Sequence, residues 1–265
     1  MSEAYWKLER RPFANTPDPA FVYQSQAFAE GLARLLYDAT DLRGGLSLIT
    51  GEIGCGKTML AQVVAERLAG SAVDIVTLPY PKVTATQMLA TLGRGLGIEP
   101  LPRGKLALVE SLGAKLSILH RNGRRPVLVV DEAQLATPSL LEEIRLLTNY
   151  EDRQDKHLHV VLLGQPELRE RVRQRPQIDQ RVSLRFHVEP MEGEDVQGYV
   201  EHRLQVAGAD RAIFHPDAFA VLAERSAGVP RRINTIATQA LFVGAMRALP
   251  FIDAALVQDV ADDQE

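Results

Sequence analysis

The sequence contains a single cysteine, Cys55, among its 265 residues, so an intramolecular disulfide is excluded. No apolar run approaches the roughly 20 residues of a membrane-spanning helix, and the first residues lack the basic and apolar regions of a signal peptide. The net charge of −4 and the pI near 5.9 give no general attraction to nucleic acid or to an anionic membrane, although they permit a local basic patch. The chain also has no internal repeat and no low-complexity tract. We therefore expect a cytoplasmic globular protein with no membrane insertion.

What the sequence does contain is a regular alternation of strand and helix patterns. Hydrophobic residues make up 46% and charged residues 24%, which is sufficient for a sizeable core. Short apolar runs predict strands at 46–50, 73–78, 126–130, 159–163 and 184–188. Helical periodicity predicts helices at 28–39, 60–68, 84–96, 109–119 and 139–150, followed by an Arg-rich helix before the last strand. Near-continuous apolar strands that alternate with helices predict a parallel sheet covered on both faces, which is an α/β fold.

Three regions follow from this pattern. Residues 1–25 are rich in proline and aromatic residues, which disfavour a long helix and predict an ordered arm. Residues 26–189 hold the five predicted strands and form the α/β core. Residues 190–265 predict a small helical subdomain, with helices at 194–207, 216–227, 231–247 and 253–261.

A glycine-rich motif lies between the first strand and the helix that follows it. The run Gly51-Glu52-Ile53-Gly54-Cys55-Gly56-Lys57-Thr58 matches the phosphate-loop pattern Gly-x4-Gly-Lys-[Ser/Thr] at every fixed position. Glycines let the backbone curl so that its N–H groups face a β-phosphate, and the helix N-terminus adds partial positive charge. Lys57 is expected to bridge the β- and γ-phosphates of ATP, and the Thr58 hydroxyl to ligate Mg2+. We expect Met59 to border this site and Cys55, at a variable position, to be inert packing. The alternative is a chance match in a glycine-containing turn.

Acidic and amide residues follow two other predicted strands. Asp131 and Glu132 come directly after the apolar run 127–130. Asp131 is expected to hold Mg2+ through water, and Glu132 to polarise the attacking water; the alternative is a solvated turn. Gln165 follows the strand at 159–163, where it senses the γ-phosphate, positions the attacking water or serves as a helix-capping residue of the loop.

Arginines form a further group of candidates. Most of those between residues 169 and 185 are expected to form a solvated helix face, but one is a candidate arginine finger for the ATP of a neighbouring subunit. Arg181 is the first choice and Arg175 the second. Arg231 opens a predicted helix after Pro230, where a positive charge opposes the helix dipole. This placement favours a contact with the γ-phosphate over a surface position. The histidines show no metal-ligand clustering in the sequence, and we assign them no metal.

These motifs, in this order, resemble an AAA+ ATPase module. Within these ATPases, the sequence most resembles the general secretion pathway protein A family, which is akin to transposition ATPases. The segments that carry this closer resemblance are Pro12-Phe13, Pro17 to Ser25, the phosphate loop, Asp131-Glu-Ala-Gln134 and Gly164-Gln-Pro-Glu-Leu168. The resemblance implies a sheet order of 5-1-4-3-2, ATP between core and helical lid, and an arm with Phe13 and Tyr23 near the adenine. It also implies homo-oligomers, commonly hexameric rings, with Arg181 acting in trans. That family continues into a membrane helix and a peptidoglycan-binding domain, whereas this sequence ends at Glu265, so we expect no envelope-spanning part.

Three functions are compatible with these motifs. The first is an ATPase that remodels a protein partner, in secretion or pilus biogenesis. The second is a DNA-binding ATPase that regulates transposition, which the Arg-rich segment favours and the net charge does not support. The third is a slow nucleotide-dependent switch or adaptor.

Overall fold

The computed structural model describes residues 2–16, 18–40, 45–153 and 155–264, which group into two compact units. The α/β unit comprises residues 30–51 and 60–188. The helical unit comprises residues 1–29, 52–59 and 189–265. In the described part of the chain, no helix combines the length and apolar character needed to cross a membrane.

The α/β unit is built on a parallel sheet of five strands in the order β2-β3-β4-β1-β5. This order, read from the other edge, is the predicted 5-1-4-3-2. The strands are β1 (Leu46–Gly51), β2 (Val73–Leu78), β3 (Arg125–Val130), β4 (His159–Gly164) and β5 (Val182–Val188). The central strands β1 and β4 are buried along their whole length, which explains their uninterrupted apolar sequences.

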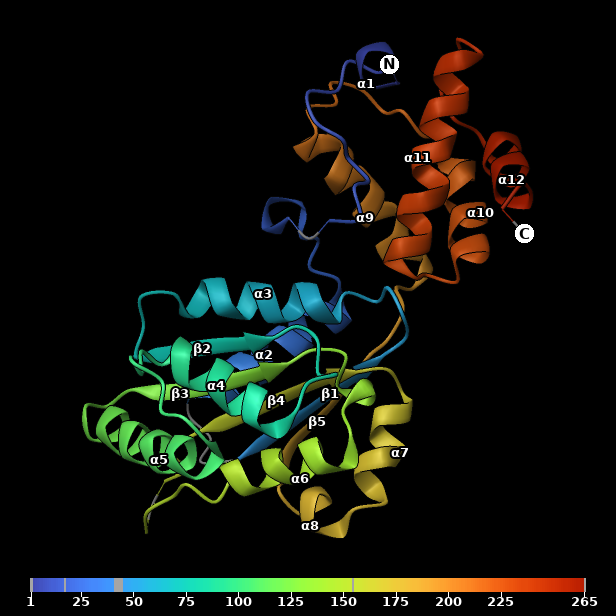
Figure 1. Cartoon of the computed structure of the whole chain (residues 1–265). Coiled ribbons are helices and arrows are strands. Elements are labelled where there is room, and N and C mark those ends of the chain that lie inside the picture. Colours follow the sequence, from blue (N-terminus) through green and yellow to red (C-terminus); the bar gives the residue numbers. More distant parts are fainter. Residues whose placement is uncertain (1, 17, 41–44, 154, 265) are drawn as a thin grey trace. The chain divides into compact units, whose positions relative to one another are not determined.

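Helices cover both faces of this sheet, as the alternating pattern predicts. Figure 1 shows α3 on one side of the sheet and α5 and α6 on the other. One face packs against a large leucine-rich core supplied by α4, α5, α6, α7 and α8. The helices of the unit are α2 (Gln26–Thr40), α3 (Lys57–Leu68), α4 (Ala85–Gly95), α5 (Lys105–Arg121), α6 (Pro138–Leu147), α7 (Glu167–Arg173) and α8 (Pro176–Asp179), with the short 3-10 helix η2 (Ala133–Leu135) after β3.

A buried polar network ties α2 to three strands. Asp38 of α2, whose side chain is fully buried, accepts hydrogen bonds from Ser47 of β1 and from Ser183 of β5 (3.3 Å). The Nε2 atom of His159, at the start of β4, lies 3.1 Å from Asp38 Oδ2 and 3.0 Å from Ser47 Oγ. Burial raises the pKa of Asp38, but the bonds from His159, Ser47 and Ser183 outweigh it and hold the pKa below its ordinary value.

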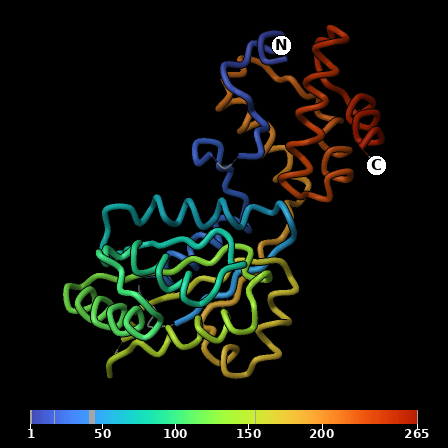
Figure 2. The backbone as a smooth tube through the Cα atoms, viewed as in Figure 1, coloured from blue at the N-terminus to red at the C-terminus, as the bar shows by residue number. Residues whose placement is uncertain are grey.

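The helical unit joins the two ends of the chain. It contains α1 (Ser2–Tyr5), η1 (Pro19–Phe21), α9 (Gly193–Val206), α10 (Pro216–Ser226), α11 (Pro230–Met246) and α12 (Ala254–Asp262). Trp6 is fully buried in its core, and its indole Nε1 donates to the carbonyl oxygen of Leu241, 2.8 Å away. The Arg203 guanidinium donates to the carbonyl oxygens of Pro12 (2.5 Å) and Ala14 (3.1 Å). The arm therefore packs with the C-terminal helices, and Figure 2 lets the reader follow its first residues beside them.

The Arg-rich segment differs from its prediction as one helix. It forms two helices, because Pro176 disfavours helical geometry at the residue before it. Arg175 accordingly has φ −125° and ψ 83°, and α8 begins at Pro176.

Candidate nucleotide-binding site

The predicted phosphate loop is residues 52–56, between β1 and the start of α3 at Lys57. Gly54 and Gly56 have φ values of 87° and 95°, a region that residues with side chains rarely adopt. The Lys57 Nζ donates a hydrogen bond to the carbonyl oxygen of Glu52, 2.8 Å away. The loop is therefore curled, and the lysine ammonium group is held against the loop's own backbone.

The other residues of the loop differ in exposure. Glu52, Ile53 and Thr58 are exposed, whereas Met59 is half-buried. Cys55 is buried, and this burial raises the pKa of its thiol above the ordinary value. Since the thiolate is the reactive form, this thiol is a poor nucleophile at neutral pH.

The first turn of α11 packs directly on this loop. The backbone N–H of Arg231 donates to the carbonyl oxygen of Gly54 (3.4 Å). A Cβ atom at Gly54 would lie 2.6 Å from the Arg231 Cβ and 3.2 Å from the Val229 Cγ1. The structure thus brings the predicted lid arginine to the middle of the loop, and only a glycine at position 54 leaves room for it.

The predicted carboxylate pair follows β3. The backbone N–H of Asp131 donates to the carbonyl oxygen of Leu78 at the end of β2 (3.0 Å), which continues the ladder between β2 and β3. Asp131 Oδ1 accepts from the backbone N–H of Glu132 (2.8 Å), and Glu132 has a left-handed backbone with φ 51°. The chain therefore turns sharply at this pair, and the next residues form η2.

Three strand ends that carry predicted site residues lie at one edge of the sheet. Val130 of β3 is in register with Leu162 of β4, and Thr50 of β1 is in register with Gly164 of β4. Because these strands are parallel, their carboxyl ends meet at one edge of the sheet. Gly51, Asp131 and Gln165 all lie at this carboxyl edge. This edge is where ligands of open α/β sheets commonly bind.

Gln134 connects the ends of β3 and β4. Its Nε2 donates to Glu132 Oε2 (2.6 Å), and its Oε1 accepts from the backbone N–H of Gln165 (3.2 Å). In the sequence, Gln134 belongs to the Asp131–Gln134 motif of the family resemblance and carries no predicted role. The signal it offered was an amide two residues after the candidate catalytic glutamate.

Comparison with known proteins finds a matching family and a related protein. A model of the AAA domain matches residues 41–172. The chain belongs to the AAA family. Its sequence is 38% identical over 253 residues to the general secretion pathway protein A of Aeromonas hydrophila, a match that covers 93% of this chain and 45% of that protein. The chain thus spans less than half the length of this relative.

Solved structures show the same AAA fold. The ORC2 protein of Aeropyrum pernix, in its ADPNP–ADP complexes, superposes with a TM-score of 0.73 at 19% identity, covering 97% of this chain and 72% of that one. The Cdc6p of Pyrobaculum aerophilum gives a TM-score of 0.71 at 16% identity, with 98% and 70% covered. The RuvB Holliday junction branch migration motor of Thermotoga maritima gives 0.55 at 16% identity, with 88% and 68% covered. At these identities the likeness concerns the fold alone.

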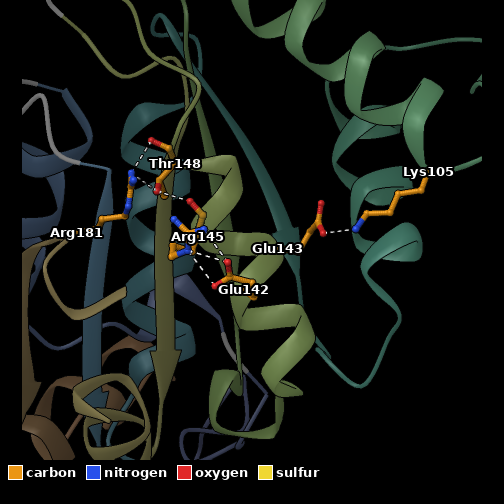
Figure 3. A network of polar contacts seen from close by, with 6 residues as sticks. All are labelled: Lys105, Glu142, Glu143, Arg145, Thr148 and Arg181. Atoms are coloured by element: carbon orange, nitrogen blue, oxygen red, sulfur yellow. Dashed lines mark hydrogen bonds and ion pairs between the residues drawn. The ribbon is translucent and has the colours of Figure 1, made fainter. Parts of the chain in front are cut away.

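The predicted arginine finger of this AAA protein lies at the opposite edge of the sheet from Asp131. Arg181 precedes β5, and its Nη1 donates to Thr148 Oγ1 (3.1 Å) and to the Thr148 carbonyl oxygen (3.4 Å). Figure 3 shows this contact beside the Arg145–Glu142 ion pair of α6 and the Lys105–Glu143 pair between α5 and α6. A strand of this length spans about 20 Å, so Arg181 cannot reach the carboxyl edge of its own sheet. Arg175, the second choice, donates to the carbonyl oxygen of Arg171 (2.7 Å).

The two aromatic residues predicted near the adenine pack within the helical unit. Phe13 is 4% exposed and lies edge-on to Phe214, with ring centroids 6.4 Å apart. Tyr23 packs edge-on against Tyr199 and donates its hydroxyl to Asp195 (3.2 Å). Burial and the nearby Asp195 raise the pKa of the Tyr23 hydroxyl. The adenine contact itself stays a prediction.

The interpretation that the histidines do not cluster is wrong for one pair. His120, at the end of α5, and His157 stack with ring centroids 4.4 Å apart and an interplanar angle of 21°. Asp152 joins them, with its Oδ2 3.0 Å from His120 Nε2 and 3.6 Å from His157 Nε2. The ligand atoms of these three side chains lie within 4.8 Å of one another, which is close enough to hold a metal ion. The arrangement is a stacked histidine pair with a common carboxylate.

Proposed function

We propose that this AAA protein binds ATP with Mg2+ and hydrolyses it to ADP and phosphate. The observation that carries the proposal is the curled loop with Lys57 held across it. β1, which leads into this loop, ends at the same sheet edge as Asp131 and Glu132. A phosphate group offers the Lys57 ammonium group a stronger, charged acceptor than the Glu52 carbonyl oxygen.

Each predicted residue then has a task. Lys57 neutralises the β- and γ-phosphates, while the backbone from Gly51 to Met59 surrounds them. Thr58 and Asp131 are the proposed Mg2+ ligands, the latter through water, and the ion when bound neutralises charge on the phosphate oxygens. Glu132 accepts a proton from the attacking water.

Further residues respond to the nucleotide. Gln165 and Arg231 are the proposed contacts of the γ-phosphate, one from the end of β4 and the other from α11. The backbone N–H of Arg231 already bonds the loop at Gly54, so loss of the γ-phosphate changes the contacts of α11 directly. Phe13 and Tyr23 are the proposed neighbours of the adenine base.

Nucleotide titration of purified protein tests this function. Replacing Lys57 by Ala removes a charge-assisted contact worth about 1.5–3 kcal/mol, so the Kd for ATP should rise roughly ten- to hundredfold. Lys82→Ala, at an exposed lysine outside the loop, is the matched control and should bind as wild type does. Glu132→Gln should retain ATP binding and lose hydrolysis. An affinity for ATP that does not depend on Mg2+ and is unchanged in Lys57→Ala would refute the assignment.

We further propose that ATP drives assembly of this chain into a homo-oligomer, in the form of a hexameric ring, and remodelling of a protein partner in the cytoplasm. The similarity to a general secretion pathway protein supports a role in secretion or pilus biogenesis. Arg181 then acts in trans on the ATP of a neighbouring subunit. Light scattering of Glu132→Gln with ATP tests the assembly, and a particle that stays monomeric contradicts it.

DNA binding is the alternative function, and it is suggested by the arginines between residues 169 and 185. The structure gives the contacts of these arginines. Arg171, Arg175 and Arg181 donate to backbone or side-chain oxygens of the same unit, and Arg185 pairs with Asp179. These arginines are thus engaged within the protein. A gel shift on duplex DNA that appears at low salt and weakens steeply as salt rises would favour the DNA-binding function instead.

A further inference from the structure

We propose that Gln134 is a positioning residue that couples Gln165, at the end of β4, to the carboxylate of Glu132. The inference rests on the proposed ATPase function. It assigns a role to a residue outside the predicted catalytic set.

The orientation of the Gln134 amide is fixed by its two partners. The Glu132 carboxylate only accepts hydrogen bonds when ionised, and the Gln165 backbone N–H only donates. The side chain therefore has to present its Nε2 to Glu132 and its Oε1 to Gln165, as the distances of 2.6 Å and 3.2 Å show. Rotating the amide by half a turn breaks both bonds, so the amide links the two residues in a single geometry.

The surroundings keep Gln134 in this place. A Cβ atom at Gly164 would lie 2.8 Å from Gln134 Oε1 and 2.7 Å from Leu168 Cδ2. The Gln134 amide therefore packs against β4 at a residue that has no side chain. The Arg171 guanidinium of α7 donates to the carbonyl oxygens of Gln134 and, at 2.6 Å, of Ala136. This fork ties η2 to the helix that follows Gln165.

Through this link, the orientation of the Glu132 carboxylate depends on the backbone position at the end of β4. If Gln165 contacts the γ-phosphate, a displacement of its backbone moves the acceptor end of Gln134, and the donor end moves the Glu132 carboxylate. The carboxylate is then oriented toward the attacking water only when Gln165, at the end of β4, contacts a γ-phosphate. Removal of the amide should leave ATP binding intact and lower the rate of the chemical step.

Steady-state ATP hydrolysis by the full chain tests the coupling. Gln134→Ala is expected to lower kcat about ten- to hundredfold, the range found when outer-shell partners that orient metal ligands are removed, with KM for ATP unchanged. Gln134→Glu keeps an acceptor for the Gln165 N–H but places a second carboxylate beside Glu132, so its kcat should fall at least as far. Gln174→Ala, which removes an exposed glutamine bonded to Glu170, is the matched control and should behave as wild type.

A double-mutant cycle separates coupling from a merely structural effect. If Gln134 acts through Glu132, then Gln134→Ala adds no further loss of kcat in a Glu132→Asp background, which keeps a carboxylate for residual hydrolysis but shortens it away from the Gln134 amide. Additive losses, an effect on KM alone, or wild-type kcat in Gln134→Ala each overturn the proposal. So does unfolding of both Gln134 variants, because the two hydrogen bonds then serve stability only. A wild-type protein that binds no ATP contradicts the proposed function instead, and this outcome is seen before any variant is made.

Discussion

Replacing Gly54 by Ala tests the packing of α11 on the phosphate loop. Gly54 and Gly56 both have positive φ, so an alanine at either position costs about 1–2 kcal/mol of backbone strain. At Gly54 the new Cβ also meets the Arg231 Cβ at 2.6 Å, whereas at Gly56 it meets nothing within 4 Å. Overpacking of this kind adds about 1–3 kcal/mol. We expect Gly54→Ala to lose about 2–5 kcal/mol of unfolding free energy and Gly56→Ala about 1–2 kcal/mol.

The single tryptophan makes this difference measurable. Trp6 is fully buried in the helical unit, to which the loop and α11 also belong. Denaturant unfolding followed by Trp6 fluorescence, without nucleotide, therefore reports on that unit. Equal destabilisation by Gly54→Ala and Gly56→Ala would refute the reasoning, because backbone strain alone would then account for both changes. A second variant, Arg231→Gly, removes the opposing Cβ and should partly restore the stability of Gly54→Ala.

Three further predictions concern separate parts of the chain. Asp38 has a lowered pKa, so its ionised form stabilises the folded state above the ordinary carboxyl pKa, and this contribution is lost as pH falls through the folded-state value. The stability difference between wild type and Asp38→Asn, measured by urea unfolding with circular dichroism, should therefore shrink below about pH 4; a constant difference contradicts this. Cys55 should react with iodoacetamide more slowly at neutral pH in the folded than in the unfolded protein, because burial raises its pKa. Mass spectrometry measures the labelling, and equal rates would count against the buried position. Arg181→Ala should retain ATP binding and lose about 10³-fold in hydrolysis once the chain assembles. Activity followed against protein concentration tests this, since an equal loss in the monomer would exclude a role in trans.

Much of the α/β architecture could be predicted from the sequence. The apolar run at 126–130 coincides with β3 to within a residue, because a buried parallel strand consists mainly of aliphatic side chains. The run at 73–78 coincides with β2, although this edge strand is only partly buried. β5 begins at Val182 rather than at residue 184, since an edge strand alternates in exposure and its first residues carry no continuous apolar signal. The strand order came from family resemblance, because sequence periodicity does not report which strands are neighbours.

The parts of the candidate site that escaped prediction depend on contacts between distant segments. Gln134 meets Gln165 only because β3 and β4 are adjacent in the sheet, and nothing in the local sequence states this adjacency. His120 and His157 meet because the end of α5 approaches the loop before β4. The phosphate loop, by contrast, has its glycines, lysine and threonine within one short segment, so the sequence alone was sufficient to find it.

The burial of Trp6 among helices from the far end of the chain has a consequence for biosynthesis. The hydrogen bond from Trp6 to Leu241 spans 235 positions, and the same core includes Val260. Domains fold as units while the chain emerges from the ribosome. The sheet can therefore form once β5 has been translated, whereas the arm must wait, with its aromatic residues uncovered, until these late helices have been made. Chaperone dependence of newly made protein should for this reason be concentrated in the arm.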